Sequence, residues 1–291
     1  MNMLKTVLLL LTASLAYGQG LKYPPDLPGS RAEVYKTIGD TKLNLYIYEP
    51  AGHKAGANRP AIVFFFGGGW ANGSPAQFQN QSKYLASRGM VAITADYRVA
   101  SRHNVKVLDC IRDANSAIRW VRQNSRRLGI DPNRIAAGGG SAGGHLAVAT
   151  ALIPELHEPD DNMEVLSRPN AIVMFNPALV LAPIPGMEKA LDLKDRIGGD
   201  PVAASPYHHI SKSAPPSIIF HGKADTTVPY ATAQAFADKM KTMKNRCDLE
   251  GYEGETHGFF NYGRGDNKAY NDTVKKMDEF FVSLKWLKGK E

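Results

Sequence analysis

Short continuous runs of hydrophobic residues recur along most of the chain. Five of them lie at 61–66, 91–95, 134–137, 171–175 and 217–220, bounded by Gly, Pro or Asp. Strands of a parallel sheet are buried on both faces and therefore need continuous apolarity. We predict that these five runs are parallel strands, and that a further strand lies near 247–252.

The segment from Ala32 to Tyr48 has a different pattern, in which polar and apolar residues alternate. Leu43, Leu45 and Ile47 fall on one face of an extended chain, and the residues between them fall on the other. Gly39-Asp40 in the middle of the segment is typical of a turn. The pattern predicts an antiparallel hairpin at one edge of the sheet.

Segments with helical periodicity lie between the predicted strands. Within 107–128, apolar residues recur at spacings of three and four and form one stripe, which consists of Ile111, Ala114, Ile118 and Val121. Further helices are predicted at 77–87, 142–152, 231–243 and 267–287. The alternation indicates a doubly wound, mostly parallel α/β sheet. We expect residues 19–291 to form one domain, with irregular insertions near 155–169 and 178–213.

The N-terminus departs from this globular pattern. The chain has 291 residues, of which 43% are hydrophobic and 22% charged, and this composition excludes a disordered protein or a small disulfide-stapled scaffold. In residues 1–18, Lys5 precedes an apolar run, and Ala16-Tyr17-Gly18 has the small-x-small form of a secretory cleavage site. The run is too short to span a bilayer stably. We expect cleavage near Gly18, a secreted or periplasmic protein and no stable membrane anchor. The alternative is an uncleaved anchor or a buried N-terminal helix.

The net charge of +7 at pH 7 raises the question of a polyanionic partner. The densest basic stretches are Arg119, Arg122, Arg126 and Arg127 on one predicted helix and Lys239, Lys241, Lys244 and Arg246 on another. Their spacing indicates solvated helix faces, and no nucleic-acid-binding signature accompanies them, so we expect no nucleic acid partner. The sequence does not show whether Cys110 and Cys247 approach each other, although an oxidising compartment would permit a disulfide.

A glycine-rich segment around Ser141 gives the strongest sign of chemistry. Gly139-x-Ser141-x-Gly143 lies between a short apolar strand and an Ala-rich helix. That context is typical of a nucleophile elbow, a strained turn that lifts a serine clear of the sheet. The alternative is a glycine-rich turn for phosphate, but the segment lacks the lysine of a P-loop.

A serine nucleophile needs a base and an acid that orients the base, and after such an elbow they follow in the order Asp, His. Asp225 follows the strand predicted at 217–220, and His257 lies in the loop after the strand near 247–252. Both residues fall where predicted strands end, at the edge where an open α/β sheet places its site. Order and position together make Asp225 and His257 the candidates.

Backbone amides suited to an oxyanion are predicted at two places. Gly67, Gly68 and Gly69 follow the buried strand 61–66, and their loop can turn its amides inward without obstruction by side chains. The helix beginning at Ala142 aims its N-terminal amides at a group beside Ser141. A flexible turn is the alternative for the three glycines.

Taken in order, these segments resemble an α/β-hydrolase of the hormone-sensitive-lipase-like esterase group, and also bacterial carbohydrate esterases that act on acetylxylan or feruloyl esters. The stretches that carry the resemblance are Phe66-Gly-Gly-Gly-Trp70, Asp96-Tyr97-Arg98, Gly139-Gly-Ser-Ala-Gly-Gly144, His221-Gly-x-x-Asp225 and Thr256-His257-Gly258-Phe259. The resemblance implies Ser141 as nucleophile, His257 as general base and then acid, and Asp225 as the residue that orients His257. It also implies an oxyanion hole formed by the amides of Gly68, Gly69 and Ala142.

The chain departs from this family pattern in three ways. Phe66 stands where the family usually has His, which puts the anchoring of the glycine loop in question. After Arg98 the chain lacks the Pro and Glu with which lipase-like members usually continue. The region before Ala32 is too short and polar for a helical cap over acyl chains. The resemblance therefore implies an α/β-hydrolase fold without a large cap domain, acting on short acyl groups.

The expected function is that of a secreted serine carboxylic-ester hydrolase that acts on short-chain acyl or aryl esters, including acetyl or feruloyl groups on polysaccharide. Trp70, beside the glycine loop, is a candidate residue of the substrate pocket. We expect no cofactor and no metal, since His208-His209 and the acidic residues at 158–161 match no ligand spacing. The alternatives are a serine peptidase of the prolyl-oligopeptidase type and a non-catalytic binding protein on the same scaffold. The oligomeric state is left open.

Overall fold

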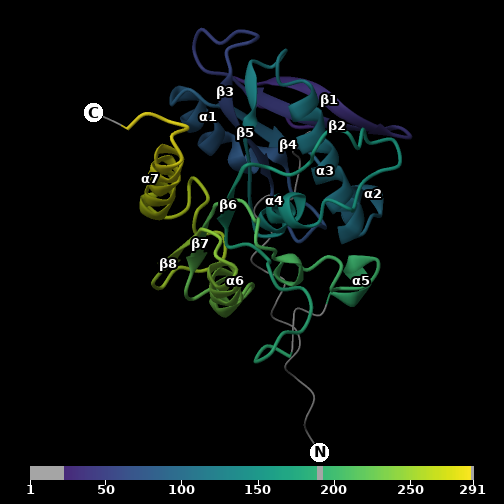
Figure 1. The fold of residues 1–291 in the computed structure, drawn as a ribbon, viewed down its shortest axis with the longest axis vertical. Coiled ribbons are helices and arrows are strands. Elements are labelled where there is room, and N and C mark those ends of the chain that lie inside the picture. Colours follow the sequence, from purple (N-terminus) through teal and green to yellow (C-terminus); the bar gives the residue numbers. More distant parts are fainter. Residues whose placement is uncertain (1–22, 189–192, 290–291) are drawn as a thin grey trace, which may run out of the picture.

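An eight-stranded sheet runs through residues 23–188 and 193–289, the part of the chain that the computed structural model describes (Figure 1). Its strands are β1 (Arg31–Ile38), β2 (Thr41–Tyr48), β3 (Arg59–Phe65), β4 (Val91–Ala95), β5 (Ile130–Gly140), β6 (Ala171–Phe175), β7 (Ser217–Gly222) and β8 (Cys247–Tyr252). Their spatial order is β1-β2-β4-β3-β5-β6-β7-β8. Only the pairs β1/β2 and β2/β4 are antiparallel, so the predicted mostly parallel sheet with an N-terminal hairpin is confirmed. The predicted signal peptide lies outside the described residues.

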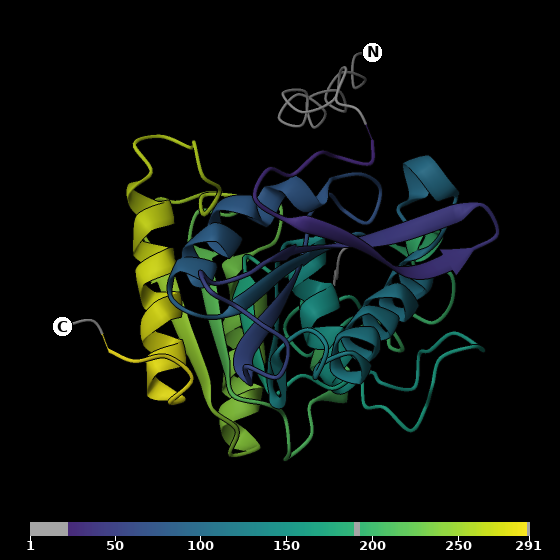
Figure 2. The same cartoon turned by 90° about the horizontal axis from the view of Figure 1, so that it is seen from above.

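Helices cover both faces of the sheet (Figures 1 and 2). They are α1 (Gln79–Ser87), α2 (Ala100–His103), α3 (Val107–Gln123), α4 (Ala142–Leu152), α5 (Lys194–Ile197), α6 (Tyr230–Thr242) and α7 (Lys268–Ser283), with short 3-10 helices η1 (Pro75–Phe78) and η2 (Pro206–His209). One buried cluster joins α3, α4 and α6 to the sheet, and a second joins α1 and α7 to it. None of these helices is long and apolar enough to cross a membrane.

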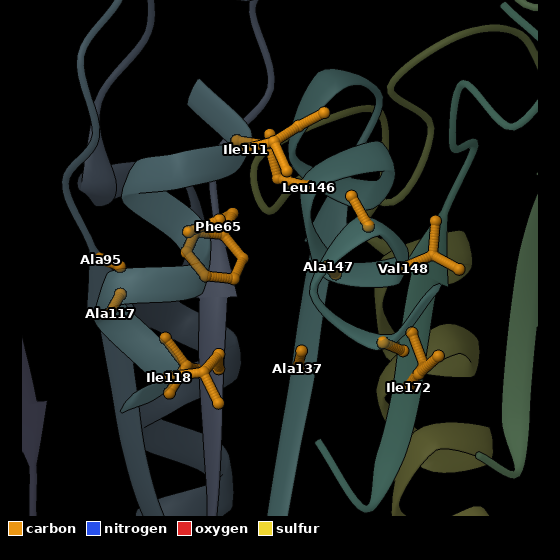
Figure 3. Close-up of a cluster of buried hydrophobic side chains, with 14 of the residues drawn as sticks. Phe65, Ala95, Ile111, Ala117, Ile118, Ala137, Leu146, Ala147, Val148 and Ile172 are labelled. Carbon is orange, nitrogen blue, oxygen red and sulfur yellow. The ribbon is translucent and has the colours of Figure 1, made fainter. Parts of the chain in front are cut away.

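Successive residues of one strand belong to different hydrophobic clusters. On β3, Val63 and Phe65 are part of the cluster under α3 and α4, whereas Ile62 and Phe64 are part of the cluster under α1 and α7. Both faces of the strand are therefore apolar, which explains the continuous hydrophobic runs in the sequence. Figure 3 shows part of the first cluster, with Phe65, Ala95, Ile111, Ala117, Ile118, Ala137, Leu146, Ala147, Val148 and Ile172 labelled.

The prediction that the arginines of α3 form a solvated helix face is wrong for two of them. Arg119 is buried, and its guanidinium forms an ion pair with Asp161 at 3.1 Å. Arg122 donates hydrogen bonds to the backbone carbonyls of Leu166 and Arg168. Both arginines therefore fasten the 155–169 insertion to α3. Helical periodicity separates polar from apolar faces, but it does not report that a distant segment covers the polar face.

The second insertion, 178–213, separates β6 from β7. Its described part carries only α5 and η2, each of four residues, so no large cap domain is built there. Both cysteines are free thiols: the Cys110 Sγ contacts the carbonyl oxygens of Arg98 and Lys106, and Cys247 begins β8.

Candidate active site

Ser141 occupies a strained turn between β5 and α4. Its backbone angles are φ 53° and ψ −118°, a combination that residues other than glycine rarely adopt. The Ser141 amide donates to the carbonyl of Phe175, and the Ser141 carbonyl accepts from the amide of His145. The turn is thus held by the neighbouring strand β6 and by the first turn of α4. This is the geometry of a nucleophile elbow.

The glycines around Ser141 leave no room for a side chain. A Cβ at Gly143 would lie 2.0 Å from the carbonyl oxygen of Phe65, and a Cβ at Gly139 would lie 2.4 Å from the carbonyl of Gly143. The neighbouring atoms belong to backbone, so they cannot rotate away. The G-x-S-x-G spacing therefore reflects close contact between the end of β3, the elbow and the start of α4.

We expect Gly143→Ala to cost about 3 kcal/mol or more of folding stability, since the backbone must move to accept the methyl group. For a domain of this size that corresponds to a fall of about 6–12 °C in the thermal midpoint. Calorimetry of the variant checks this. Gly289→Ala is the matched control, because nothing lies within 4 Å of its Cβ position. An equal midpoint for the two variants would contradict the predicted close packing.

Ser141, His257 and Asp225 form one chain of hydrogen bonds. The Ser141 Oγ lies 2.9 Å from the His257 Nε2, and the His257 Nδ1 lies 2.7 Å from the Asp225 Oδ2. Because a carboxylate only accepts, the Nδ1 carries the proton, and the Nε2 is left free to accept the serine proton. Residues 141, 225 and 257 lie in the turns and loops that follow β5, β7 and β8, where their sequence positions placed them.

Asp225 is held in its ionised form. The amides of Thr227 and Val228 each donate to its Oδ1 at 2.9 Å. Burial opposes ionisation, but hydrogen bonds to His221 and His257 and the charge of His257 outweigh burial, so the pKa of Asp225 lies well below its usual value. The carboxylate therefore stays negative across the neutral range and can stabilise a protonated His257.

The glycine loop lies against the elbow. A Cβ at Gly67 would be 3.3 Å from the Ser141 Cβ, and Gly68 and Gly69 have positive φ angles of 126° and 62°. The amides of Gly68 and Gly69 donate to no acceptor among the described residues. The amide of Ala142, the first residue of α4, has no partner within its helix. Three unpaired donors thus belong to the two segments that meet at Ser141, where an oxyanion would form.

Trp70 lies mostly in the core, with 6% of its surface exposed. Its indole Nε1 donates to the Nδ1 of His145 at 3.2 Å, and the Nε2 of His145 donates to the carbonyl of Ala204 at 2.7 Å. This arrangement joins the glycine loop to α4. A contact between Trp70 and substrate stays a prediction.

His145 makes the folded state sensitive to acid. Complete burial lowers its pKa to about 4, because a charged imidazolium would lose its hydration there, and the hydrogen bond to the carbonyl of Ala204 only partly opposes this. The unfolded chain takes up the proton near pH 6.5, so this group's stabilisation is complete above pH 6.5 and is lost as the pH falls toward 4. The expected loss is about 3 kcal/mol. In urea unfolding at pH 4.5 and 7, His145→Gln should show a smaller pH difference than the wild type; an unchanged difference would exclude His145 as the cause.

Three further side chains support the site. Gln77 accepts from the amide of Gly67, Asn176 accepts from the amide of Gly258, and the His221 Nε2 donates to the carbonyl of Val228. His221 was visible in the H-G-x-x-D stretch, but Gln77 and Asn176 belong to no pattern that sequence analysis could use. Among the described residues, no group of three or more His, Cys, Asp or Glu could hold a metal ion.

Comparison with known proteins agrees with this geometry. The BD-FAE family model matches residues 45–240, and the dienelactone hydrolase family model matches residues 199–284. Esterase LipC of Mycobacterium tuberculosis is 30% identical over 69% of this chain and 53% of its own length. The chain spans about half the length of the curated relatives it matches.

Solved structures give a closer likeness. The apo form of Thermogutta terrifontis esterase 2 is 54% identical, with a TM-score of 0.89, over 93% of this chain and 100% of that one. A propionate-bound form of the same esterase has a TM-score of 0.88 at 54% identity, with the same coverage. The eight-stranded sheet of the present chain and the family match over its residues 45–240 support the same family assignment. The chain belongs to the BD-FAE family, among the hormone-sensitive-lipase-like esterases of the α/β-hydrolase superfamily.

Proposed function

We propose that this protein hydrolyses carboxylic esters through an acyl-enzyme formed on Ser141. The observation that carries the proposal is the continuous hydrogen-bonded chain from the Ser141 Oγ through His257 to the ionised Asp225. This series of hydrogen bonds ends at Ser141, which lies between the glycine loop and the N-terminus of α4. These two segments carry the unpaired amides of Gly68, Gly69 and Ala142. Nucleophile, base, orienting acid and oxyanion donors are the parts that acyl transfer requires.

The mechanism follows from the proton positions. His257 takes the Ser141 proton at its Nε2 as the Oγ attacks the ester carbonyl. The amides of Gly68, Gly69 and Ala142 stabilise the oxyanion, each contributing about 3 kcal/mol to lowering the barrier. His257 then gives its proton to the leaving alcohol. Water, deprotonated in the same way, attacks the acyl-enzyme and releases the acid.

Short acyl groups are the proposed substrates. The described part of the 178–213 insertion builds only two four-residue helices, too little to enclose a long acyl chain. The similar esterase of Thermogutta terrifontis has been solved with propionate bound, a short acid of the kind this reaction would release. We include acetyl and feruloyl groups on polysaccharide in the proposal, because an exported esterase would meet such polymers.

A release assay tests the activity and the substrate together. The substrates are nitrophenyl acetate, propionate and octanoate, acetylated xylan, feruloylated arabinoxylan and a short triglyceride, and Ser141→Ala is the control. We expect the short nitrophenyl esters to react fastest, with a steep fall toward octanoate. Faster hydrolysis of an aminoacyl nitroanilide than of any ester would favour a prolyl-oligopeptidase-type peptidase. Absence of Ser141-dependent hydrolysis of every ester would favour a binding protein.

We also propose that the protein is exported. The support is the sequence of residues 1–18, with a basic start, an apolar run and a small-x-small site at Ala16-Tyr17-Gly18. Intact mass spectrometry of the protein from the periplasm or the medium of cells that express the full chain is the test. We expect an N-terminus at Gln19. Recovery of the chain only from the cytoplasm, beginning at Met1, would contradict export.

A further inference from the structure

A line of side-chain amides joins the glycine loop to the loop that carries His257. The amide of Gly67 donates to the Gln77 Oε1 at 2.6 Å, and the Gln77 Nε2 donates to the Asn261 Oδ1 at 3.0 Å. The Asn261 Nδ2 then donates to the carbonyl of Gly258 at 2.9 Å. These three hydrogen bonds connect segments that are almost 200 residues apart in the sequence, since Gly67 and Gly258 are 191 positions apart.

The hydrogen bond from Gly67 to Gln77 uses the first amide of the glycine loop. Because Gly67 donates to Gln77, its peptide group is fixed, and the following peptides carry the unpaired amides of Gly68 and Gly69. Gln77 thus holds the peptide group from which the two glycines with free amides follow. Both ends of the Gln77 side-chain amide are used in this line: the Oε1 accepts from Gly67, and the Nε2 donates to Asn261.

The last bond holds the loop of the general base. Gly258 follows His257 directly; its carbonyl accepts from Asn261, and its amide donates to the buried Asn176. All three hydrogen bonds of the line point the same way, from Gly67 to Gly258, so each amide polarises the next. The backbone beside His257 is therefore coupled to the backbone that presents the oxyanion donors.

We infer that Gln77 is a positioning residue that keeps the oxyanion amides and His257 in register, a role that rests on the proposed function. Phe66 cannot supply such an anchor, since its ring stacks on Tyr97 with centroids 4.1 Å apart and has no polar atom. Gln77 holds the N–H of the Phe66–Gly67 peptide group, whose carbonyl accepts from the Tyr97 hydroxyl at 2.7 Å. Its side-chain amide bonds Gly67 and Asn261, and among the described residues it bonds no atom of Ser141, His257 or Asp225, so its effect passes through the two loops.

Kinetics of Gln77→Leu, Asn261→Ala and the double variant test this role on a short nitrophenyl ester. Misplacing catalytic groups by a fraction of an ångström costs activity steeply, and we expect each single variant to lose roughly tenfold in kcat. KM should stay within about twofold, because ground-state binding does not depend on the line. The double variant should lose no more than the larger single variant, because either substitution already breaks the same connection.

Gln79→Leu is the matched control, since the Gln79 Nε2 donates to the carbonyl of Pro28, away from Ser141 and His257. Thermal midpoints of all variants separate positioning from loss of fold. The inference is overturned if Gln77→Leu keeps the kcat of Gln79→Leu, if its loss of kcat follows a fall in midpoint, or if the two single losses multiply. Failure of the proposed function gives a different result, because Ser141→Ala would then hydrolyse the ester at the same rate as the wild type.

Discussion

Replacement of Ser141 by alanine is expected to lower kcat on short esters by about 10⁵-fold or more. The variant loses the only nucleophile of the hydrogen-bonded chain, and the His257 Nε2 loses its partner at 2.9 Å. The Cβ remains in place, so the strained turn and its backbone hydrogen bonds are kept. Steady-state assays with the purified variant measure the loss.

The fold should be unaffected by that substitution, and calorimetry provides the check. Rapid mixing with a nitrophenyl ester should show a burst of nitrophenol for the wild type and none for Ser141→Ala, because only the wild type forms an acyl-enzyme. A variant that retains more than about a thousandth of wild-type kcat with an unchanged burst would exclude Ser141 as the nucleophile.

Asp225→Asn is expected to lower kcat by about 10⁴-fold, although the side chain keeps its shape. The amides of Thr227 and Val228 donate to the Oδ1, so the new amide group keeps its oxygen there and turns its NH₂ toward His257. The His257 Nδ1 must then accept instead of donate. The ring proton moves to the Nε2, which can no longer accept the proton of Ser141.

The variant also loses an ionised carboxylate that stabilises the fold at neutral pH. Asp225 has a lowered pKa, so its stabilisation is present above the ordinary carboxyl pKa and is lost as the pH falls below it. Activity should therefore be measured well below the thermal midpoint of the variant. Asp160→Asn, at an exposed position, is the control. Equal kcat for the two variants would show that Asp225 does not orient the base.

The strands and helices could be read from the sequence because their signal is local. The runs at 91–95 and 171–175 coincide with β4 and β6, and the helix predicted at 142–152 coincides with α4. The helix predicted over 107–128 ends earlier, at Gln123. The polar residues after Gln123 fit the periodicity of the helix although they lie in a turn. Periodicity alone therefore does not show where a helix ends.

The members of the hydrogen-bonded chain could also be predicted, because their order and their places at strand ends are constrained by the fold. What could not be predicted are contacts that depend on distant segments meeting. Gln77 lies in η1, just before α1, and its partner Asn261 lies 184 positions away. Arg119 was predicted to lie in solvent, because no residue near it in the sequence indicates the ion pair with Asp161. The hydrogen bond from the Trp70 indole to His145 likewise joins segments 75 positions apart, and no local pattern predicts it.

The three residues of the hydrogen-bonded chain are synthesised at different times. A ribosome completes β3, the glycine loop and the Ser141 elbow long before β7 and β8, which bring Asp225 and His257 to the other side of β6. A nascent chain or fragment that ends between residues 178 and 257 has the segments that hold the Ser141 turn, but it lacks the histidine that acts as base in the proposed mechanism. If the proposed mechanism holds, esterase activity begins only when β7 and β8 have joined the sheet, and incomplete chains do not hydrolyse esters.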